Sequence, residues 1–420
     1  MRLTSRLPGF HRLDLAHRRQ WLLKGEAKAE DLEALEPGRA LGLETADKMV
    51  ENAVGVISLP LGIGLNFQIN GRDHLVPMAV EEPSVVASAS HAARIVRQSG
   101  GFQTEATNRE MIGQVEVRTC VNPATAKVSL LRHEAEILAV ADSVHPTMRA
   151  RGGGARAISV HPLPDGLVVH LIVDTCDAMG ANTVNTMVEA IAPLISDLTG
   201  GRVGLRILSN YTDSCLARAR CVIAPAHLTA PGFSGPEVRD GIVQATLFAG
   251  ADFHRAVTHN KGVMNGVDAV VIATGNDWRA IEAAAHGHAC RTGRYRPLTT
   301  WDVDLDGNLV GSLELPMPVG SVGGSVGLTP GTRAALRLCG VEGAQELAQL
   351  IVAVGLAQNL GALKALATHG IQHGHMALHA RSVALAAGAQ GELVERVAQE
   401  IVRLGEVRVS AAREILARLT

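Results

Sequence analysis

Ionisable side chains stand among glycines and other small residues in four short segments of this 420-residue sequence. The first is Glu81-Glu82-Pro83-Ser84, which places carboxylates at the expected start of a helix, because proline suits the first helical turn. The helix dipole there favours an ionised carboxylate, whereas burial favours the neutral acid. A surface helix cap is the commoner use of such a segment, so a proton-transfer role for Glu82 remains one of two interpretations.

The second segment runs from Arg255 to Gly266 and holds Lys261 among two asparagines and flanking glycines. A lysine in a partly dry site stabilises a developing oxyanion strongly. A polar turn with an exposed lysine is the alternative, and it is the better interpretation of this segment on its own.

The third segment places Asp277 between Thr274-Gly275-Asn276 and Trp278, where the indole would partly desolvate the carboxylate; the alternative is an ordinary Asx turn. The fourth is a histidine series with two spacings of four residues, a pattern that zinc can use on one helix face. Gly370 and Gly374 make a continuous helix doubtful there, and no H-E-x-x-H motif is present. We therefore expect no metal, and a histidine that donates a proton. The series comprises His369, His373, His375 and His379.

Two further segments have the small residues that phosphate-binding loops require. The segment from Asp177 to Thr186 is expected to join a strand to a helix, where a pyrophosphate can approach free backbone N–H groups. It does not have the G-x-G-x-x-G spacing of a Rossmann fold. The glycine-rich segment from Pro318 to Gly324 lacks the lysine of a P-loop.

Composition narrows the classes of protein to consider. The chain is 47% hydrophobic and 19% charged, which excludes a disordered chain. The net charge is −2 and only 3% of residues are aromatic, so nothing favours nucleic-acid binding. The apolar stretch from Ala53 to Phe67 is broken by Pro60 and glycines, and we expect no membrane-spanning segment. We expect a cytoplasmic protein with reduced cysteines, whose excess apolar surface forms a subunit interface.

The expected elements place most of these segments at the ends of helices. Residues 109–214 have the order β-α-β-β-α-β, with strands near 114–118, 157–160, 167–173 and 203–208 and helices near 126–142 and 182–198. The stretch 58–73 is expected to be irregular, and from residue 215 helices alternate with glycine-rich segments. Residues 346–368 form a long apolar helix for a core or interface, and two amphipathic helices follow.

In combination, the segments resemble the 3-hydroxy-3-methylglutaryl-CoA (HMG-CoA) reductase family, and they occur in the same order. The resemblance covers nearly the whole chain; it is closest to the class II branch and, within it, to the bacterial degradative enzymes. The segments that carry it are Glu82-Pro83-Ser84, Asp177-Ala178-Met179-Gly180-Ala181-Asn182, His259-Asn260-Lys261-Gly262, Thr274-Gly275-Asn276-Asp277-Trp278 and Gly374-His375-Met376.

The resemblance implies an α+β fold in three parts. A large α-rich domain, residues 1–108 and 215–374, would bind the acyl-CoA and form a homodimer or a higher multiple of dimers. An inserted ferredoxin-like domain, residues 109–214, would bind the nicotinamide cofactor, and residues 375–420 would form a helical flap. The active site would lie at the subunit interface.

The resemblance also implies the reaction and its residues. HMG-CoA would be reduced through two hydride transfers to mevalonate and CoA, or mevalonate would be oxidised in reverse. Lys261 would hold the oxyanion, Glu82 would move a proton, Asp277 would lie near both, and His375 would protonate the CoA thiolate. The implied substrate-binding residues are Ser84, Arg255, Asn265, Gln358 and Asn359.

The implied cofactor is NAD, with NADP as the alternative. In relatives that use NAD, an aspartate after the first helix of the small domain contacts the ribose 2′-hydroxyl, but here His145 holds that place. Arg149 and Arg151 lie nearby and would attract a 2′-phosphate. The implied cofactor-binding residues are His145, Asp177, Met179, Gly180, Ala181 and Asn182.

Two other functions remain open from the sequence. One is a catalytically silent CoA-binding or assembly protein on the same fold, although Glu82, Lys261, Asp277 and His375 are all present. The other is a zinc hydrolase built on the histidine series, which metal analysis would distinguish from a reductase.

Overall fold

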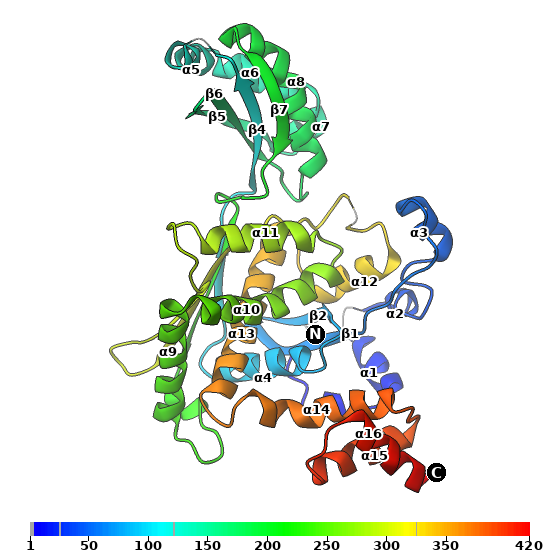
Figure 1. The fold of residues 1–420 in the computed structure, drawn as a ribbon. Helices are drawn as coiled ribbons and strands as arrows, with labels where there is room; N and C mark the ends of the chain where they lie inside the picture. Colours follow the sequence, from blue (N-terminus) through cyan, green and yellow to red (C-terminus); the bar gives the residue numbers. More distant parts are fainter. Residues whose placement is uncertain (1–3, 25–26, 121, 325) are drawn as a thin grey trace.

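The computed structural model describes residues 4–24, 27–120, 122–324 and 326–420, and it leaves the side chains of residues 371–378 outside its description. A large body of helices and two sheets carries a smaller sheet-and-helix unit at one end and a helical bundle at the other (Figure 1). All pairs of named strands are antiparallel, so the expected α+β class is confirmed. The six cysteines are free.

The N-terminal part of the large body contains a hairpin that the sequence analysis missed. Residues 58–73 were expected to be irregular, and this expectation is wrong: β1 and β2 pair across a turn at Asn70 and Gly71. Both turn residues have positive φ, 48° and 79°, which is what a type I′ hairpin turn demands and Asn-Gly supplies. The elements are α1 (Leu15–Leu22), α2 (Ala29–Ala34), α3 (Leu43–Met49), β1 (Leu61–Ile69), β2 (Arg72–Ala79) and α4 (Val85–Arg97).

The small unit has the predicted β-α-β-β-α-β order. Its four strands lie in the order β5-β6-β4-β7, with helices over one face, and it has its own hydrophobic core. The helix expected over 126–142 is two helices that meet at His133. The elements are β4 (Glu110–Arg118), α5 (Pro123–Arg132), α6 (Glu134–Ser143), α7 (Pro146–Ala150), β5 (Gly154–Leu163), β6 (Gly166–Asp174), α8 (Ala181–Thr199) and β7 (Arg202–Leu208).

The centre of the large body is a second four-stranded sheet, in the order β3-β8-β10-β9, packed against helices. Its strands were not predicted, although the alternation of apolar and arginine side chains from Ala217 to Cys221 is a strand signal. The elements are β3 (Gln103–Ala106), β8 (Leu216–Ile223), α9 (Gly235–Ala251), α10 (Phe253–Ala273), α11 (Trp278–Ala289), β9 (Thr299–Val303), β10 (Leu309–Pro316), α12 (Pro330–Cys339) and α13 (Ala344–Leu366).

Helix α13 forms the middle of the core, as its apolar sequence predicted. By length and composition alone it also passes as a candidate membrane-spanning helix, which the sequence analysis did not recognise. In the described residues 78% of its most apolar window is buried inside the protein, which is what a core helix shows. The cytoplasmic location remains a prediction.

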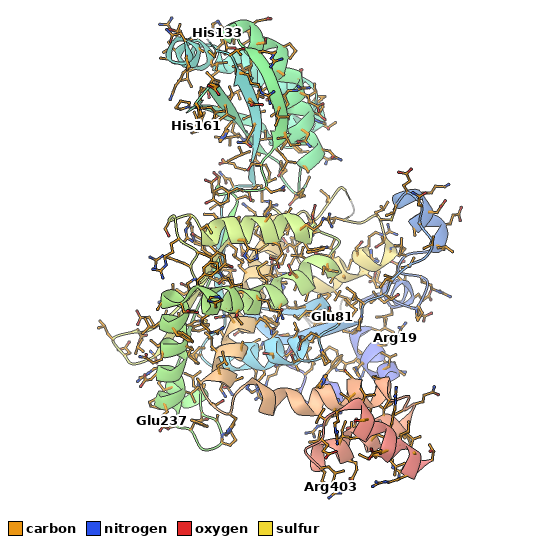
Figure 2. All side chains as sticks on the ribbon, in the orientation of Figure 1. Arg19, Glu81, His133, His161, Glu237 and Arg403 are labelled. Carbon is orange, nitrogen blue, oxygen red and sulfur yellow. The ribbon has the colours of Figure 1, made fainter. Side chains whose placement is uncertain are left out.

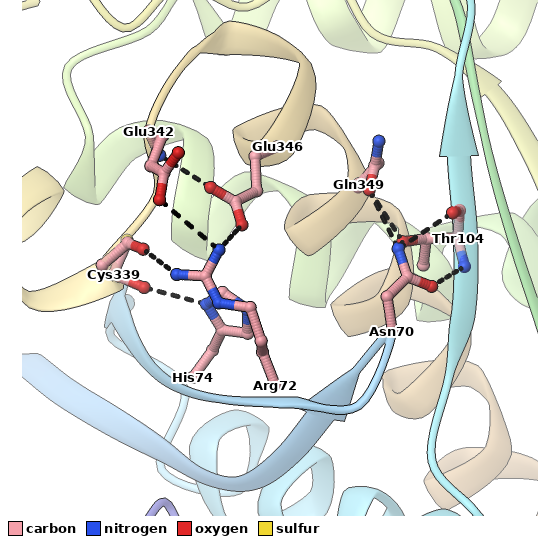
Figure 3. A network of polar contacts seen from close by, with 9 residues as sticks. Asn70, Arg72, His74, Thr104, Cys339, Glu342, Glu346 and Gln349 are labelled. Atoms are coloured by element: carbon pink, nitrogen blue, oxygen red, sulfur yellow. Dashed lines mark hydrogen bonds and ion pairs between the residues drawn. The ribbon is translucent and has the colours of Figure 1, made fainter. Parts of the chain in front are cut away.

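A polar network ties the first turn of α13 to the β1–β2 hairpin (Figure 3). Arg72 donates to Glu346 at 2.5 Å and to the carbonyl of Gly340 at 3.1 Å. Asn70 donates to the side chains of Thr104 and Gln349, at 3.0 Å and 3.2 Å. These contacts join three segments that are far apart in sequence, and they fix the hairpin whose far end leads to Glu82.

The C-terminal bundle consists of α14 (Ile371–Ala386), α15 (Glu392–Arg403) and α16 (Val409–Leu419), and it has a separate hydrophobic core. The two amphipathic tail helices were predicted and are confirmed. The bundle follows α13 through Gly370, whose φ is 83°.

Candidate active site

The segment that contains Glu82 lies near the turn that contains Asp277. Ala79 at the end of β2 packs against Ala273 at the end of α10, three residues before Glu82 and four before Asp277. The Ser84 hydroxyl, which is buried, donates to Glu82 at 3.0 Å. Figure 2 shows the neighbouring Glu81 within the large body, far from His161 of the small unit and Arg403 of the bundle.

Asp277 is held by its own helix. Its carboxylate caps α11 by accepting from the N–H groups of Arg279 and Ala280, at 3.0 Å and 3.2 Å, and it pairs with the Arg279 guanidinium at 3.1 Å. The side chain is 37% exposed, so it remains accessible to a substrate or a second subunit.

Buried Asn276 connects this turn to the expected cofactor segment. Its amide accepts from the N–H of Gly320 at 2.7 Å and donates to the Gly320 carbonyl at 3.1 Å. A Cβ at Gly320 would lie 2.7 Å from the backbone nitrogen of Met179, so only glycine fits there. The backbone N–H of the next residue, Ser321, donates to the Asp177 carbonyl at 2.9 Å. The structure thus places Asp177 and Met179 against the turn that leads to Asp277.

The start of α8 has the features that a pyrophosphate needs. Gly180 precedes the helix with φ of 84°, and a Cβ there would collide with Thr175. No side chain caps this end, so the first N–H groups of the helix, at Ala181 and Asn182, remain available for an anion. The described residues therefore fit the phosphate part of a nicotinamide cofactor.

His145 lies before α7 at the edge of the same unit, and among the described residues its buried Nε2 has no hydrogen-bond partner. Arg149 pairs with buried Asp142, whose carboxylate also accepts from the N–H of Ala155 at 2.8 Å. Arg151 is exposed, and no ion pair to a described residue occupies it. Of the two arginines, Arg151 is the one available to an added phosphate.

Lys261, Arg255 and Asn265 lie on α10, away from Asp277. From Lys261 to Ala273 the helix advances by 12 residues, about 18 Å. Lys261 is exposed, and no ion pair joins it to Asp277 within the described part of the chain. Burial lowers the pKa of Arg255. One chain therefore places the end of β2 and the 177–182 segment beside the turn of Asp277, whereas Lys261 lies about 18 Å along α10 from that turn.

Lys261 follows two exposed apolar side chains on one stripe of α10. Phe253 is 60% exposed and Val257 is 40% exposed, and spacings of four residues align both with Lys261. Leu247 and Phe248 of α9 are 59% and 57% exposed. Exposed apolar side chains that gather on neighbouring helices beside a lysine are typical of an interaction site.

Gln358 and Asn359 are buried on α13. The side-chain carbonyl of Asn359 accepts from the Thr299 hydroxyl at 2.9 Å and from the Trp301 indole N–H at 2.8 Å. It is therefore already engaged in hydrogen bonds within the core. The Oε1 of Gln358 is buried without a partner. The Thr299 hydroxyl also contacts His259 at 2.6 Å, and burial, with the charge of Arg255, lowers the pKa of this histidine to about 4.

The histidine series is described only in part. The side chains of His373 and His375 lie outside the described residues, although both positions belong to α14. His369 contacts Phe233 edge-on with ring centroids 5.2 Å apart, and His379 is exposed. In the described residues, no three His, Cys, Asp or Glu side chains group as ligands for a metal.

A basic cluster on α4 and α13 was missed in the sequence. Arg94 donates to the Nδ1 of His91 at 3.2 Å, and burial and the charge of Arg94 lower the pKa of Lys364. Burial, Arg94 and Lys364 lower the pKa of His91 to about 4. No described carboxylate forms an ion pair with these residues, so the cluster is suited to an anionic ligand. Its members are 270 residues apart in the chain, from Arg94 to Lys364, and no local pattern reveals them.

Comparison with known proteins identifies relatives along the whole chain. Residues 14–380 match the family model of hydroxymethylglutaryl-coenzyme A reductase. The 3-hydroxy-3-methylglutaryl-coenzyme A reductase of Archaeoglobus fulgidus is 48% identical over 421 residues, which cover 99% of this chain and 95% of the relative. A probable reductase of Borreliella burgdorferi is 34% identical and covers 80% of this chain and 77% of its own length.

Solved structures give the same result. The 3-hydroxy-3-methylglutaryl-coenzyme A reductase of Streptococcus pneumoniae superposes with a TM-score of 0.84 and 43% identity, over 98% of this chain and 99% of that chain. A structure of that class II enzyme bound to NADPH in open conformations superposes with a TM-score of 0.83 and 44% identity, over 86% of this chain and 99% of the other.

Proposed function

The chain belongs to class II of the hydroxymethylglutaryl-coenzyme A reductase family, and from this membership we propose that it interconverts HMG-CoA and mevalonate plus CoA by two successive hydride transfers. The observation that carries the proposal is the contact of the 177–182 segment with the turn at Asp277, through Asn276 and Gly320. This contact supports the proposal because it would bring a cofactor held by the 177–182 segment close to the Asp277 carboxylate.

The roles of the residues follow from the charges that the reaction creates. The nicotinamide cofactor supplies or accepts the hydride. Each addition of hydride to a carbonyl forms an oxyanion, which the ammonium of Lys261 stabilises. Glu82 provides the proton, and Ser84 orients Glu82 through their hydrogen bond. Arg255 binds the free carboxylate of the substrate, with Asn265 one turn beyond Lys261.

The complete site needs two subunits. Glu82 and Asp277 lie at one end of α10, and Lys261 is about 18 Å along the helix from that end, too far for direct pairing in one chain. The exposed Phe253 and Val257 beside Lys261 are suited to burial by a second copy. Val54 and Ile57, which are 99% and 95% exposed, offer a second apolar surface. We therefore expect a homodimer in which one chain supplies Lys261 and its partner supplies Asp277.

The three parts of the chain have separate tasks in this proposal. Residues 109–214 bind the cofactor, residues 1–108 and 215–374 bind the acyl-CoA and form the dimer, and residues 375–420 form the flap. His375 protonates the CoA thiolate, which otherwise recaptures the aldehyde. The basic cluster of His91, Arg94 and Lys364 binds phosphates of CoA, which lie at the far end of a long arm from the thioester.

NAD is the cofactor that the resemblance to degradative enzymes favours, and in that case the chain oxidises mevalonate. NADP is the second candidate, because Arg151 is exposed beside the cofactor segment and the relative from Streptococcus pneumoniae binds NADPH. Relatives that use NAD have an aspartate at this position, which would repel a 2′-phosphate, and this chain has His145 there.

The test is an absorbance assay of the reduced nicotinamide, with HMG-CoA or with mevalonate plus CoA, for both cofactors. We expect turnover that requires CoA in the oxidative direction. A chain that binds CoA but turns over with neither cofactor would be the silent binding protein. If NADP is the substrate, Arg151→Ala raises its KM about tenfold and leaves the KM of NAD unchanged.

A further inference from the structure

The two residues before Lys261 are buried, although Lys261 itself is exposed, and both hydrogen bond to the segment that leads into β9. The side chain of Asn260 donates to the carbonyl of Arg296 at 2.9 Å and accepts from the N–H of Leu298 at 2.8 Å. It therefore fixes α10 to this segment immediately before Lys261.

A second set of contacts begins at His259 and ends at α13. The Nε2 of His259 lies 2.6 Å from the hydroxyl of Thr299 in β9. This hydroxyl donates to the Oδ1 of Asn359 on α13 at 2.9 Å, and the indole N–H of Trp301 donates to the same oxygen at 2.8 Å. All four side chains are more than nine-tenths buried, so water does not compete for these hydrogen bonds.

The protons of this set can be assigned, because an indole N–H is only a donor. The contact with Trp301 identifies the Asn359 atom as the amide oxygen, and Thr299 therefore uses its single hydroxyl proton on that oxygen. The proton in the 2.6 Å contact then belongs to the Nε2 of His259, which donates to Thr299. The Nδ2 of Asn359 is a second donor, and its distance of 3.3 Å from Nε2 is correspondingly longer.

The Nδ1 of His259 is thus the nitrogen without a proton. It is buried, and it has no hydrogen-bond partner in the part of the chain that the structure describes. A protonated Nδ1 would be a charged donor without an acceptor in this place, which is costly in a buried site. The geometry therefore favours the neutral imidazole with its proton on Nε2.

The contacts of His259 and Asn260 together determine how Lys261 is presented. Successive residues of a helix point in directions about 100° apart, so contacts from two neighbours fix both the position and the rotation of α10 at this turn. Lys261 is the next residue, and the direction of its side chain follows from theirs.

We propose that His259 is a positioning residue, which as the neutral Nε2–H tautomer donates to Thr299 and thereby aims the Lys261 ammonium at the substrate oxygen. The inference rests on the proposed role of Lys261. Asn359, which the family resemblance made a candidate for substrate binding, acts in this proposal through Thr299 and His259. A shift of about 1 Å in a catalytic group can lower turnover about a hundredfold, so loss of the hydrogen bond should reduce kcat.

The first test compares two substitutions of His259 in the full-length protein. His259→Gln keeps an N–H donor near the place of Nε2, whereas His259→Leu fills a similar volume without a donor. We expect kcat of the Gln variant within about threefold of wild type and kcat of the Leu variant about thirtyfold lower, with the KM of the cofactor unchanged in both.

The matched control is His74, a buried histidine of β2 whose Nδ1 contacts the Cys339 carbonyl at 3.0 Å. His74→Leu should lower the midpoint of urea unfolding but leave kcat within about twofold of wild type. If His259 only stabilises the fold, His259→Leu should behave in the same way, and retention of kcat by this variant would overturn the inference.

Substitutions of Thr299 test the same hydrogen bond if His259→Leu does not fold. Thr299→Val keeps the shape of the side chain but has no hydroxyl, whereas Thr299→Ser keeps the hydroxyl. We expect kcat about tenfold lower for the Val variant and close to wild type for the Ser variant. Equal kcat values for the two variants would contradict the proposed chain of donors.

The tautomer can be measured without any assay of activity. NMR spectra of protein with isotope-labelled imidazole nitrogens, assigned by comparison with His259→Gln, should show His259 neutral at pH 7 with its proton on Nε2. A proton on Nδ1 would overturn the inference. If wild type shows no reductase activity, the proposed function fails, and the spectra still decide whether His259 donates to Thr299.

Discussion

Lys261 meets the largest chemical demand in the proposed site, since its ammonium must stabilise the oxyanion that each hydride addition creates. We predict that Lys261→Ala lowers kcat by about a thousandfold or more while the assembly of subunits is unchanged. The measurements are steady-state kinetics and light scattering. Lys127→Ala, at an exposed position of α5, is the control and should retain full activity. Appreciable turnover by the Lys261→Ala variant would remove Lys261 from its assigned role.

In the proposed mechanism His375 has a narrower task, because only the steps that release or capture CoA involve a thiolate. We predict that His375→Gln reduces turnover of HMG-CoA much more than reduction of added mevaldehyde, which lacks the thioester. Parallel assays with the two substrates measure the difference. Equal losses would contradict a role in protonating the thiolate.

The residue types of the site were predictable, but only in part from physical chemistry. Acids and a lysine among glycines indicate catalytic loops only weakly. The site residues were predicted because these segments occur in the same order as in a known family. Arg94 and Lys364 could not be predicted, because their proximity depends on the packing of α4 against α13.

At the scale of elements, Gly320 of the large body packs closely against the 177–182 segment that is proposed to bind the cofactor. An added Cβ would lie 2.7 Å from the backbone nitrogen of Met179, and neither backbone can yield without moving the segment. We predict that Gly320→Ala raises the KM of the cofactor about tenfold and changes the KM of HMG-CoA less. Gly250→Ala in α9 meets no atom within 4 Å and should leave both constants unchanged. An unaltered cofactor KM in the Gly320→Ala variant would argue against this segment as the cofactor site.

An ion pair between α4 and the β1–β2 hairpin also anchors the N-terminal segment, because Thr4 and Ser5 donate to the same Asp73 carboxylate. Arg97 donates to Asp73 at 2.7 Å and 3.0 Å, and the side chains are 21% and 16% exposed. Burial would raise the pKa of Asp73, but the hydrogen bonds from Arg97, Ser5 and Thr4 outweigh it and lower the pKa.

This contribution is therefore present above pH 4 and is lost as the pH falls further. We predict that Arg97→Ala costs about 2 kcal/mol at pH 7 in urea unfolding, and less at pH 3. The control is Arg118, which pairs with Glu116 on the surface, and Arg118→Ala should leave the stability nearly unchanged at both pH values. An equal cost at both pH values would contradict the role of the ionised Asp73.

The sequence predicted the elements of the small unit better than those of the large body. Alternating apolar residues and a turn at Pro164-Asp165 define β5 and β6 locally. In the large body, β8 carries a short alternating signal, but its partners β3 and β10 are far away in sequence, so tertiary packing decides which strands it pairs with. The hairpin at Asn70-Gly71 carried a clear turn signal, which the surrounding glycines and proline obscured.

At the scale of the whole molecule, Lys261 lies about 18 Å along α10 from the end that leads to Asp277. The proposed active site needs both residues. The end at Ala273 carries Asp277 and the cofactor segment, and Lys261 lies near the apolar surface of Phe253 and Val257. The excess of apolar residues in the sequence predicted a subunit interface, but its location depends on which side chains the fold leaves exposed.

Mixed dimers test this shared site most directly. We propose to co-produce Lys261→Ala and Asp277→Ala chains with different affinity tags and to measure kcat of the purified mixed dimer. If partner chains share each site, one site of the mixed dimer carries both substitutions and the other carries none, so the dimer should regain about half of wild-type activity while each homodimer is inactive. A mixed dimer as inactive as its parents would show that Lys261 and Asp277 do not act across the interface.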